Sequence, residues 1–96
     1  MSMNDKVALI TGASSGIGRA TAQAFAAKGA SVVLAARRQE ELDSLVAEIE
    51  AAGGRATAIK TDVSKAEEVE RMVAHAIDTF GRLDYAVNNE IGRAHV

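Results

Sequence analysis

The chain of 96 residues contains no cysteine, which excludes disulfide bonds and thiol catalysis and is compatible with a reducing compartment. Its net charge of -2 at pH 7 lacks the basic excess that binding to a phosphate backbone requires, so we expect no nucleic-acid partner. No apolar run approaches the roughly 18 residues of a membrane span, and the first six residues are too polar and too short for a signal peptide. We therefore expect a cytoplasmic protein with no membrane partner. Its two histidines belong to no metal-ligand pattern, so no metal site is predicted.

Apolar runs alternate with segments of helical periodicity along almost the whole chain. A length of 96 residues with 48% hydrophobic content allows at most one compact α/β domain. Regular alternation with short loops predicts a parallel sheet, and right-handed crossovers give it the strand order 3-2-1-4. The expected strands are 7–10, 31–34, 56–60 and 83–87, and the expected helices are 17–28, a second one around 42–49, and 64–80.

Three glycines follow the first expected strand. Gly12 can adopt the unusual backbone angles of a tight turn, Gly16 lets a phosphate approach the backbone, and Gly18 lets the next helix lie close to the strand. The free N–H groups and the positive dipole end of that helix would face the anion. We predict a pyrophosphate cradle for NAD or NADP; a purely structural turn is the alternative. A P-loop for a nucleoside triphosphate is excluded, because Arg19-Ala20 follows Gly18 where that loop needs Lys-Ser/Thr.

The spacing of these residues also indicates a family. Thr11-Gly12-x-x-x-Gly16-x-Gly18 resembles the signature of the short-chain dehydrogenase/reductases, whereas other Rossmann proteins carry Gly-x-Gly-x-x-Gly. Asp62-Val63 follows the third strand, where the family holds the adenine ring, and Asn88-Asn89 resembles the start of its Asn-Asn-Ala-Gly motif. The resemblance covers residues 5–89. It implies a Rossmann-type doubly wound sheet, truncated after its fourth strand, from an oxidoreductase that interconverts an alcohol and a carbonyl and assembles as a homo-oligomer.

The end of the second strand bears on the choice of cofactor. An NAD site places a carboxylate there for the ribose hydroxyl, whereas here Ala36 occupies that position and Arg37 follows. A guanidinium can make charge-assisted hydrogen bonds to the additional phosphate of NADP, worth about 1.5 to 3 kcal/mol. We predict that NADP(H) is preferred and that NAD(H) is possible. In the alternative, Arg37 and Arg38 are solvated residues at a helix start.

Asp62 and the asparagine pair allow two interpretations each. Asp62 could cap the third helix, since it lies two residues before a Ser-x-x-Glu capping box at 64–67, but we favour contact with adenine. Asn89 is the better cofactor candidate, because it ends its strand where open sheets bind ligands, and we expect Asn88 to satisfy backbone groups between strands. The predicted cofactor-binding residues are Gly12, Ser14, Ser15, Gly16, Ile17, Gly18, Arg37, Asp62, Val63 and Asn89.

The residues that the family uses for hydride transfer are missing. The family needs a tyrosine with a lysine four residues later, but Tyr85 is the only tyrosine and Asn89 is the fourth residue after it. No serine or histidine has the context of a catalytic triad. We therefore expect no catalytic residue: the chain is the cofactor-binding portion of an NADP-dependent oxidoreductase. A non-catalytic dinucleotide sensor or scaffold, or a polypeptide with no function of its own, are the alternatives.

The last seven residues depart from the family pattern. Residues 1–89 are expected to be the N-terminal part of a Rossmann NAD(P)-binding domain. Residues 90–96 match the translation of a common sequencing adapter followed by a stop codon, so we expect them to be a non-native tail. A genuine terminus with a diverged motif is the alternative. A half-sheet of this size should be marginally stable, and its fourth strand should form an open edge.

Overall fold

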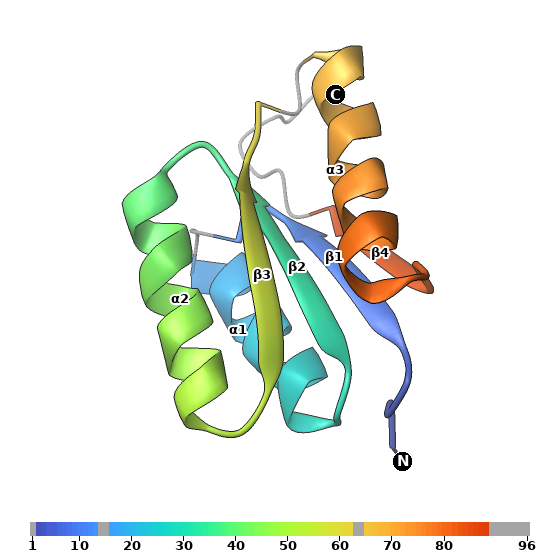
Figure 1. Ribbon diagram of the computed structural model, residues 1–96. Helices are drawn as coiled ribbons and strands as arrows, with labels where there is room; N and C mark the ends of the chain where they lie inside the picture. Colours follow the sequence, from blue (N-terminus) through green and yellow to red (C-terminus); the bar gives the residue numbers. More distant parts are fainter. Residues whose placement is uncertain (1, 14–15, 63–64, 89–96) are drawn as a thin grey trace.

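Strands and helices alternate along the chain, and the strands form one parallel sheet in the predicted order β3-β2-β1-β4 (Figure 1). The computed structural model describes residues 2–13, 16–62 and 65–88. The observed elements are β1 (Val7–Thr11), α1 (Gly16–Ala27), β2 (Ser31–Ala36), α2 (Gln39–Ala51), β3 (Arg55–Lys60), α3 (Ala66–Phe80) and β4 (Tyr85–Asn88).

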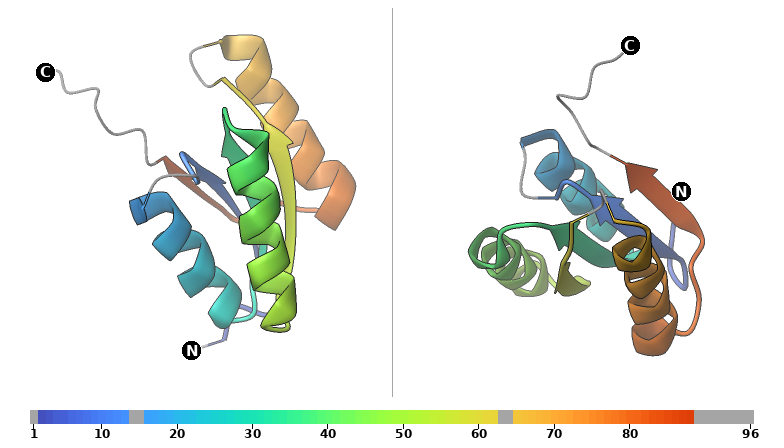
Figure 2. Two further views of the ribbon diagram at one scale, coloured as in Figure 1. Left: turned by 90° about the vertical axis from the view of Figure 1, so that its left-hand side faces the viewer. Right: turned by 90° about the horizontal axis from the view of Figure 1, so that it is seen from above.

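The sheet is covered on both faces, and this explains the continuous apolar runs of its two central strands. All residues of β1 and β2 are buried, as is typical of parallel sheets with helices on either side. Alternate residues of these strands point to opposite faces. One face, with Ile10 and Leu34, packs against α1 and α2, and the other, with Leu9 and Val33, packs against Met72 and Ala76 of α3. Figure 2 shows this division, with α1 and α2 on one face of the sheet and α3 on the other.

The start of α3 differs from the predicted capping box. The N-cap is Lys65, in extended conformation with φ -113° and ψ 127°, and no side chain caps it. Ser64, the expected capping residue, lies outside the described residues. Because the helix begins one residue later than the box at 64–67 requires, the third helical position is Glu68 rather than Glu67. The predicted end of this helix is confirmed: Gly81 adopts φ 85° and its N–H donates to the Ile77 carbonyl.

The apolar residues of α3 form a stripe along the helix, and only part of this stripe is buried. Met72 and Ala76 are buried, whereas Val69, Val73 and Ile77 remain 38 to 45% exposed. A single helix covers this face, so the flank of its stripe contacts no further element in the described chain. None of the helices within the described ranges is long and apolar enough to cross a membrane.

Candidate functional site

The carboxyl ends of all four strands lie at one edge of the sheet, because every strand pair is parallel. This is the edge at which open α/β sheets bind ligands. The loops that leave β1, β2 and β3 there carry the glycines, Arg37 and Asp62. Ser14, Ser15, Val63 and Asn89, also predicted to bind the cofactor, lie outside the described residues.

The three glycines after β1 occupy three different environments. Gly12 has a positive φ of 63°, a conformation that glycine adopts without strain. A Cβ atom on Gly18 would lie 2.1 Å from the Gly12 carbonyl oxygen, so no side chain fits where α1 packs on the loop. A Cβ on Gly16 would meet no atom within 4 Å among the described residues beyond its chain neighbours and its own helix backbone. Gly18 therefore has a structural reason to be glycine that Gly16 does not have in this chain alone.

Backbone hydrogen bonds hold the loops after β1 and β3 against the end of β2. The Ala13 N–H donates to the Ala35 carbonyl at 3.2 Å, and the Thr61 N–H donates to the Ala36 carbonyl at 2.8 Å. On the other side of the glycine loop, the Thr11 hydroxyl donates to the Val87 carbonyl at 3.4 Å. These bonds bring the glycine loop, the residues after β2 and the start of the loop after β3 to one place.

The first turn of α1 contains no acidic residue, in contrast to the other two helices. The first turn of α2 carries Glu40 and Glu41, and that of α3 carries Glu67 and Glu68. Carboxylates in a first turn offset the positive end of the helix dipole, so α1 alone leaves it uncompensated by its own side chains. Ile17 projects from this turn with 62% of its surface exposed.

The two consecutive arginines after β2 differ in their contacts. Arg38 pairs with Glu41, with 3.3 Å between Nη1 and Oε2, and it forms the N-cap of α2. Arg37 is exposed and makes no ion pair with any of the described residues. The guanidinium predicted to recognise the additional phosphate is thus not engaged by a carboxylate of the described chain.

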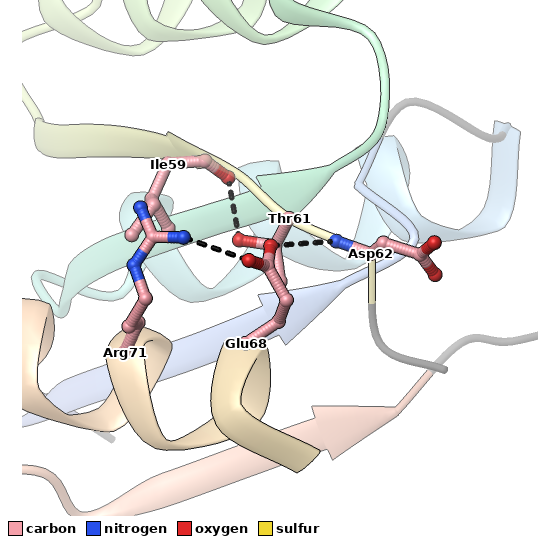
Figure 3. Close-up of polar contacts among 5 residues, drawn as sticks. All are labelled: Ile59, Thr61, Asp62, Glu68 and Arg71. Carbon is pink, nitrogen blue, oxygen red and sulfur yellow. Dashed lines mark hydrogen bonds and ion pairs between the residues drawn. The ribbon is translucent and has the colours of Figure 1, made fainter. Parts of the chain in front are cut away.

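Asp62 is half-buried and is fixed through its backbone to the start of α3. Its N–H donates to Oε1 of Glu68 at 3.3 Å, and its carbonyl accepts from the Lys65 N–H at 3.2 Å. Figure 3 shows the Asp62 carboxylate pointing away from Glu68 and Arg71. No sequence motif assigns a role to Glu68; its position three residues after the N-cap is the signal that identifies it.

Asp84 is the other polar residue that the sequence analysis missed, and it lies at the opposite edge of the sheet. Its carboxylate accepts the Val7 N–H at 2.8 Å and pairs with Arg82, while its own N–H donates to the Val7 carbonyl. The Arg82 hydrogen bond, followed by that of the Val7 N–H, lowers the pKa of Asp84 below its ordinary value. Asp84 therefore fastens β4 to β1 and lies away from the candidate site.

His75 has a structural role in the contact between α3 and β3. Its Nε2 is hydrogen-bonded to the Thr57 hydroxyl at 3.2 Å, which links α3 to β3. Within the parts of the chain that the structure describes, no group of three or more potential ligands could hold a metal ion. Tyr85 packs beside Phe25, with ring centroids 5.7 Å apart.

Comparison with known proteins decides the family. A family model described as short chain dehydrogenase matches residues 6–92. The chain belongs to the short-chain dehydrogenase family. Among curated members of this family, it is 50% identical over 86 residues to an A-factor type gamma-butyrolactone 1'-reductase of Streptomyces virginiae. It is 48% identical over 85 residues to a 3-oxoacyl-[acyl-carrier-protein] reductase of Synechocystis.

Solved structures of short-chain dehydrogenases show the same arrangement. A hydroxysteroid dehydrogenase from Escherichia coli matches 91% of this chain with a TM-score of 0.88 and 37% identity. An actinorhodin polyketide ketoreductase variant, crystallised with NADPH, matches 93% with a TM-score of 0.84 and 38% identity. The chain covers 37% and 34% of these two structures. The alignments with the two curated relatives include 90% and 88% of this chain but only 34% of each relative. The chain therefore spans about one third of their length.

Proposed function

We propose that the chain binds the adenosine-diphosphate half of NADP(H) at the carboxyl edge of its sheet. The observation that carries this proposal is the contrast between Gly16 and Gly18. A Cβ on Gly18 would collide with the Gly12 carbonyl, whereas a Cβ on Gly16 would lie more than 4 Å from every described residue other than its chain neighbours and the backbone of its own helix. A phosphate approaching at Gly16 would meet the first N–H groups of α1, a helix start without an acidic side chain.

The residues present fit a dinucleotide in their chemistry. The glycine loop and the start of α1 would hold the pyrophosphate, and Ile17 offers exposed apolar surface beside it. Asp62 and Val63 would contact adenine. Ser14, Ser15 and Asn89 belong to the proposed site on the sequence pattern alone.

Arg37 is proposed to favour NADP(H) over NAD(H), although NAD(H) binding is possible. It is exposed, follows β2 directly, and has no carboxylate partner in the described part of the chain, so its guanidinium can meet a ribose phosphate. Arg37→Asp should abolish a preference of about tenfold to hundredfold, because a carboxylate repels the additional phosphate. Titration calorimetry with NADPH and NADH measures the ratio. An unchanged ratio would mean that Arg37 does not determine the preference.

For the whole protein, we propose an NADP-dependent oxidoreductase that interconverts an alcohol and a carbonyl. The support is the family and the reductase names of its relatives. When bound, the nicotinamide would donate or accept a hydride, and the residues described here would bind and orient the dinucleotide. We propose no catalytic residue in this chain, because it has no Tyr-x-x-x-Lys pair. We also propose that the whole protein is a homo-oligomer. A coding sequence for the longer protein that lacks this pair would favour the sensor or scaffold alternative.

Paired glycine variants test the binding proposal. Gly16→Ala adds a methyl group that clashes with none of the described residues, so we expect a folded chain with an unchanged melting temperature and at least about tenfold weaker NADPH binding. Circular dichroism establishes folding and calorimetry measures affinity. Ala20→Gly, an exposed change one turn further along the helix, is the control for altered helix propensity. If Gly16→Ala binds NADPH as tightly as the unchanged chain, or the unchanged chain does not bind NADPH, the proposal is wrong.

A further inference from the structure

Glu68 stands out among the acidic residues of α3 because its side chain is engaged on both oxygens. Its Oε1 accepts the Asp62 N–H at 3.3 Å, and its Oε2 pairs with Nη1 of Arg71 at 2.7 Å (Figure 3). Only 22% of its side chain is exposed, compared with 62% for Arg71. Glu67, its neighbour in the same first turn, is exposed, and its side chain makes no hydrogen bond or ion pair with any of the described residues.

The contact with Asp62 falls where the hydrogen bonding of the sheet ends. Thr61 is the last residue after β3 whose N–H is accepted by β2, through the Ala36 carbonyl. The next N–H, that of Asp62, has to find an acceptor outside the ladder, since an unpaired half-buried N–H is costly. Glu68 supplies that acceptor from the neighbouring helix.

The carbonyl of Asp62 is fixed by the same segment. It accepts the Lys65 N–H at 3.2 Å, one residue before α3 begins. Both backbone polar groups of Asp62 are therefore held by residues 65–68, while its carboxylate points away from Glu68 (Figure 3). The backbone of a residue held in this way gives its side chain a defined direction.

Arg71 limits the freedom of Glu68 in turn. It lies three residues further along the helix, where side chains of the same face meet, and it binds the oxygen that Asp62 does not use. An exposed ion pair of this kind contributes little to stability, but it restricts the rotamers of the carboxylate that it holds. The order of contacts runs from Arg71 through Glu68 to Asp62.

We propose that Glu68 is a positioning residue for the adenine end of the dinucleotide site, and that it acts by fixing the backbone of Asp62. The inference rests on the proposed contact of Asp62 with adenine. A side chain that is already oriented before the ligand arrives loses less conformational entropy on binding. Loss of the Glu68 carboxylate should therefore weaken dinucleotide binding although Glu68 itself does not touch the ligand.

The test is a double-mutant cycle between Glu68→Ala and Asp62→Ala, with NADPH affinity measured by calorimetry on the whole chain. We expect Glu68→Ala to weaken binding about fivefold to tenfold when Asp62 is present and to have no further effect in the Asp62→Ala background. Glu68→Gln keeps an oxygen acceptor for the Asp62 N–H, so its affinity should stay within about twofold of the original. Glu67→Ala removes a first-turn carboxylate that lacks this contact and should leave affinity unchanged.

The outcomes separate this inference from the proposed function. If Asp62→Ala weakens binding but Glu68→Ala does not, or if Glu68→Ala weakens it equally in both backgrounds, Glu68 is not a positioning residue for Asp62. If Asp62→Ala binds as the unchanged chain does, the adenine contact itself is wrong and the inference falls with it. Should Glu68→Ala fail to fold, Arg71→Gln releases Glu68 without removing it, and a smaller loss of about twofold that vanishes in the Asp62→Ala background is then expected. An Arg71→Gln chain with unaltered NADPH affinity would overturn the role of this chain of contacts.

Discussion

The edge of the sheet where the strands begin (the amino edge) and the edge where they end (the carboxyl edge) differ in how their polar groups are paired. At the amino edge, backbone polar groups are hydrogen-bonded within the chain. Val7 is bonded through both its N–H and its carbonyl to Asp84, and the Ser31 N–H donates to the Lys6 carbonyl. At the carboxyl edge, α1 starts without a carboxylate, Ile17 is exposed, and Arg37 has no charged partner in the described chain. One edge is closed by its own side chains, whereas the other presents charge and apolar surface that an anionic ligand can use.

Among changes that alter one of the two edges, Gly18→Ala is expected to have the largest effect, because it disrupts the packing of α1 on the glycine loop at the carboxyl edge. The new Cβ would lie 2.1 Å from the Gly12 carbonyl oxygen, so α1 has to move away from the loop. We expect a loss of about 3 kcal/mol in the free energy of unfolding, at the upper end for overpacking changes. Urea denaturation measures this loss, and Gly16→Ala is the matched control. Equal stability of the two variants would contradict the close packing of α1 on the glycine loop.

An intermediate effect is expected when the start of α1 is made to resemble the starts of α2 and α3. Ile17→Glu introduces a carboxylate into the first turn, where it should stabilise the helix by about 0.3–1 kcal/mol and repel a pyrophosphate. We expect NADPH affinity to fall about tenfold while the melting temperature is maintained or rises. Thr21→Glu, one turn later, is the control. If the two variants bind NADPH equally well, the absence of acidic residues at the start of α1 has no bearing on the ligand.

The smallest effect is expected at the amino edge, from Asp84→Asn. The lowered pKa of Asp84 means that the folded state binds its proton less readily than the unfolded state does. Its contribution to stability is therefore present above the ordinary value of 3.8 and is lost as the pH falls through the lowered value. Urea denaturation should show a small deficit of Asp84→Asn at pH 7 that shrinks toward pH 3, with NADPH affinity unaltered. Asp78→Asn, an exposed helical site with no charged partner among the described residues, should show no such trend.

Local sequence patterns predicted the order of the elements and the sheet. The runs around Ile10 and Val33, with the glycines that end α1 and α3, are signals carried by neighbouring residues, and the strand order follows from a general rule of handedness. The predicted strand boundaries were short by one or two residues at Thr11 and Ala36, where burial rather than periodicity extends the ladder.

Local sequence patterns could not predict the interactions between residues that are distant in the sequence. The capping-box pattern, a purely local signal, placed the start of α3 one residue too early, whereas the observed contact of Glu68 with the Asp62 N–H depends on where β3 ends. Asp84 is separated by 77 residues from the N–H that it accepts, so no spacing in the sequence could reveal the pair. The exposure of Val69, Val73 and Ile77 on α3 could not be predicted either, because an apolar periodicity identifies a face but does not tell what covers it.

The contact between Asp84 and Val7 also has a consequence for the order in which the chain can fold. The edge of β1 that faces β2 can pair as soon as the first crossover is made, but its other edge has no partner until the last strand arrives. Closing a loop of this length costs only slightly more entropy than closing a shorter one, but it delays the encounter. We therefore expect β1, β2 and β3 to assemble first with α1 and α2, and β4 to be added last. During synthesis, β1, one of the two central strands, would be among the first segments to be made and among the last to be fully paired.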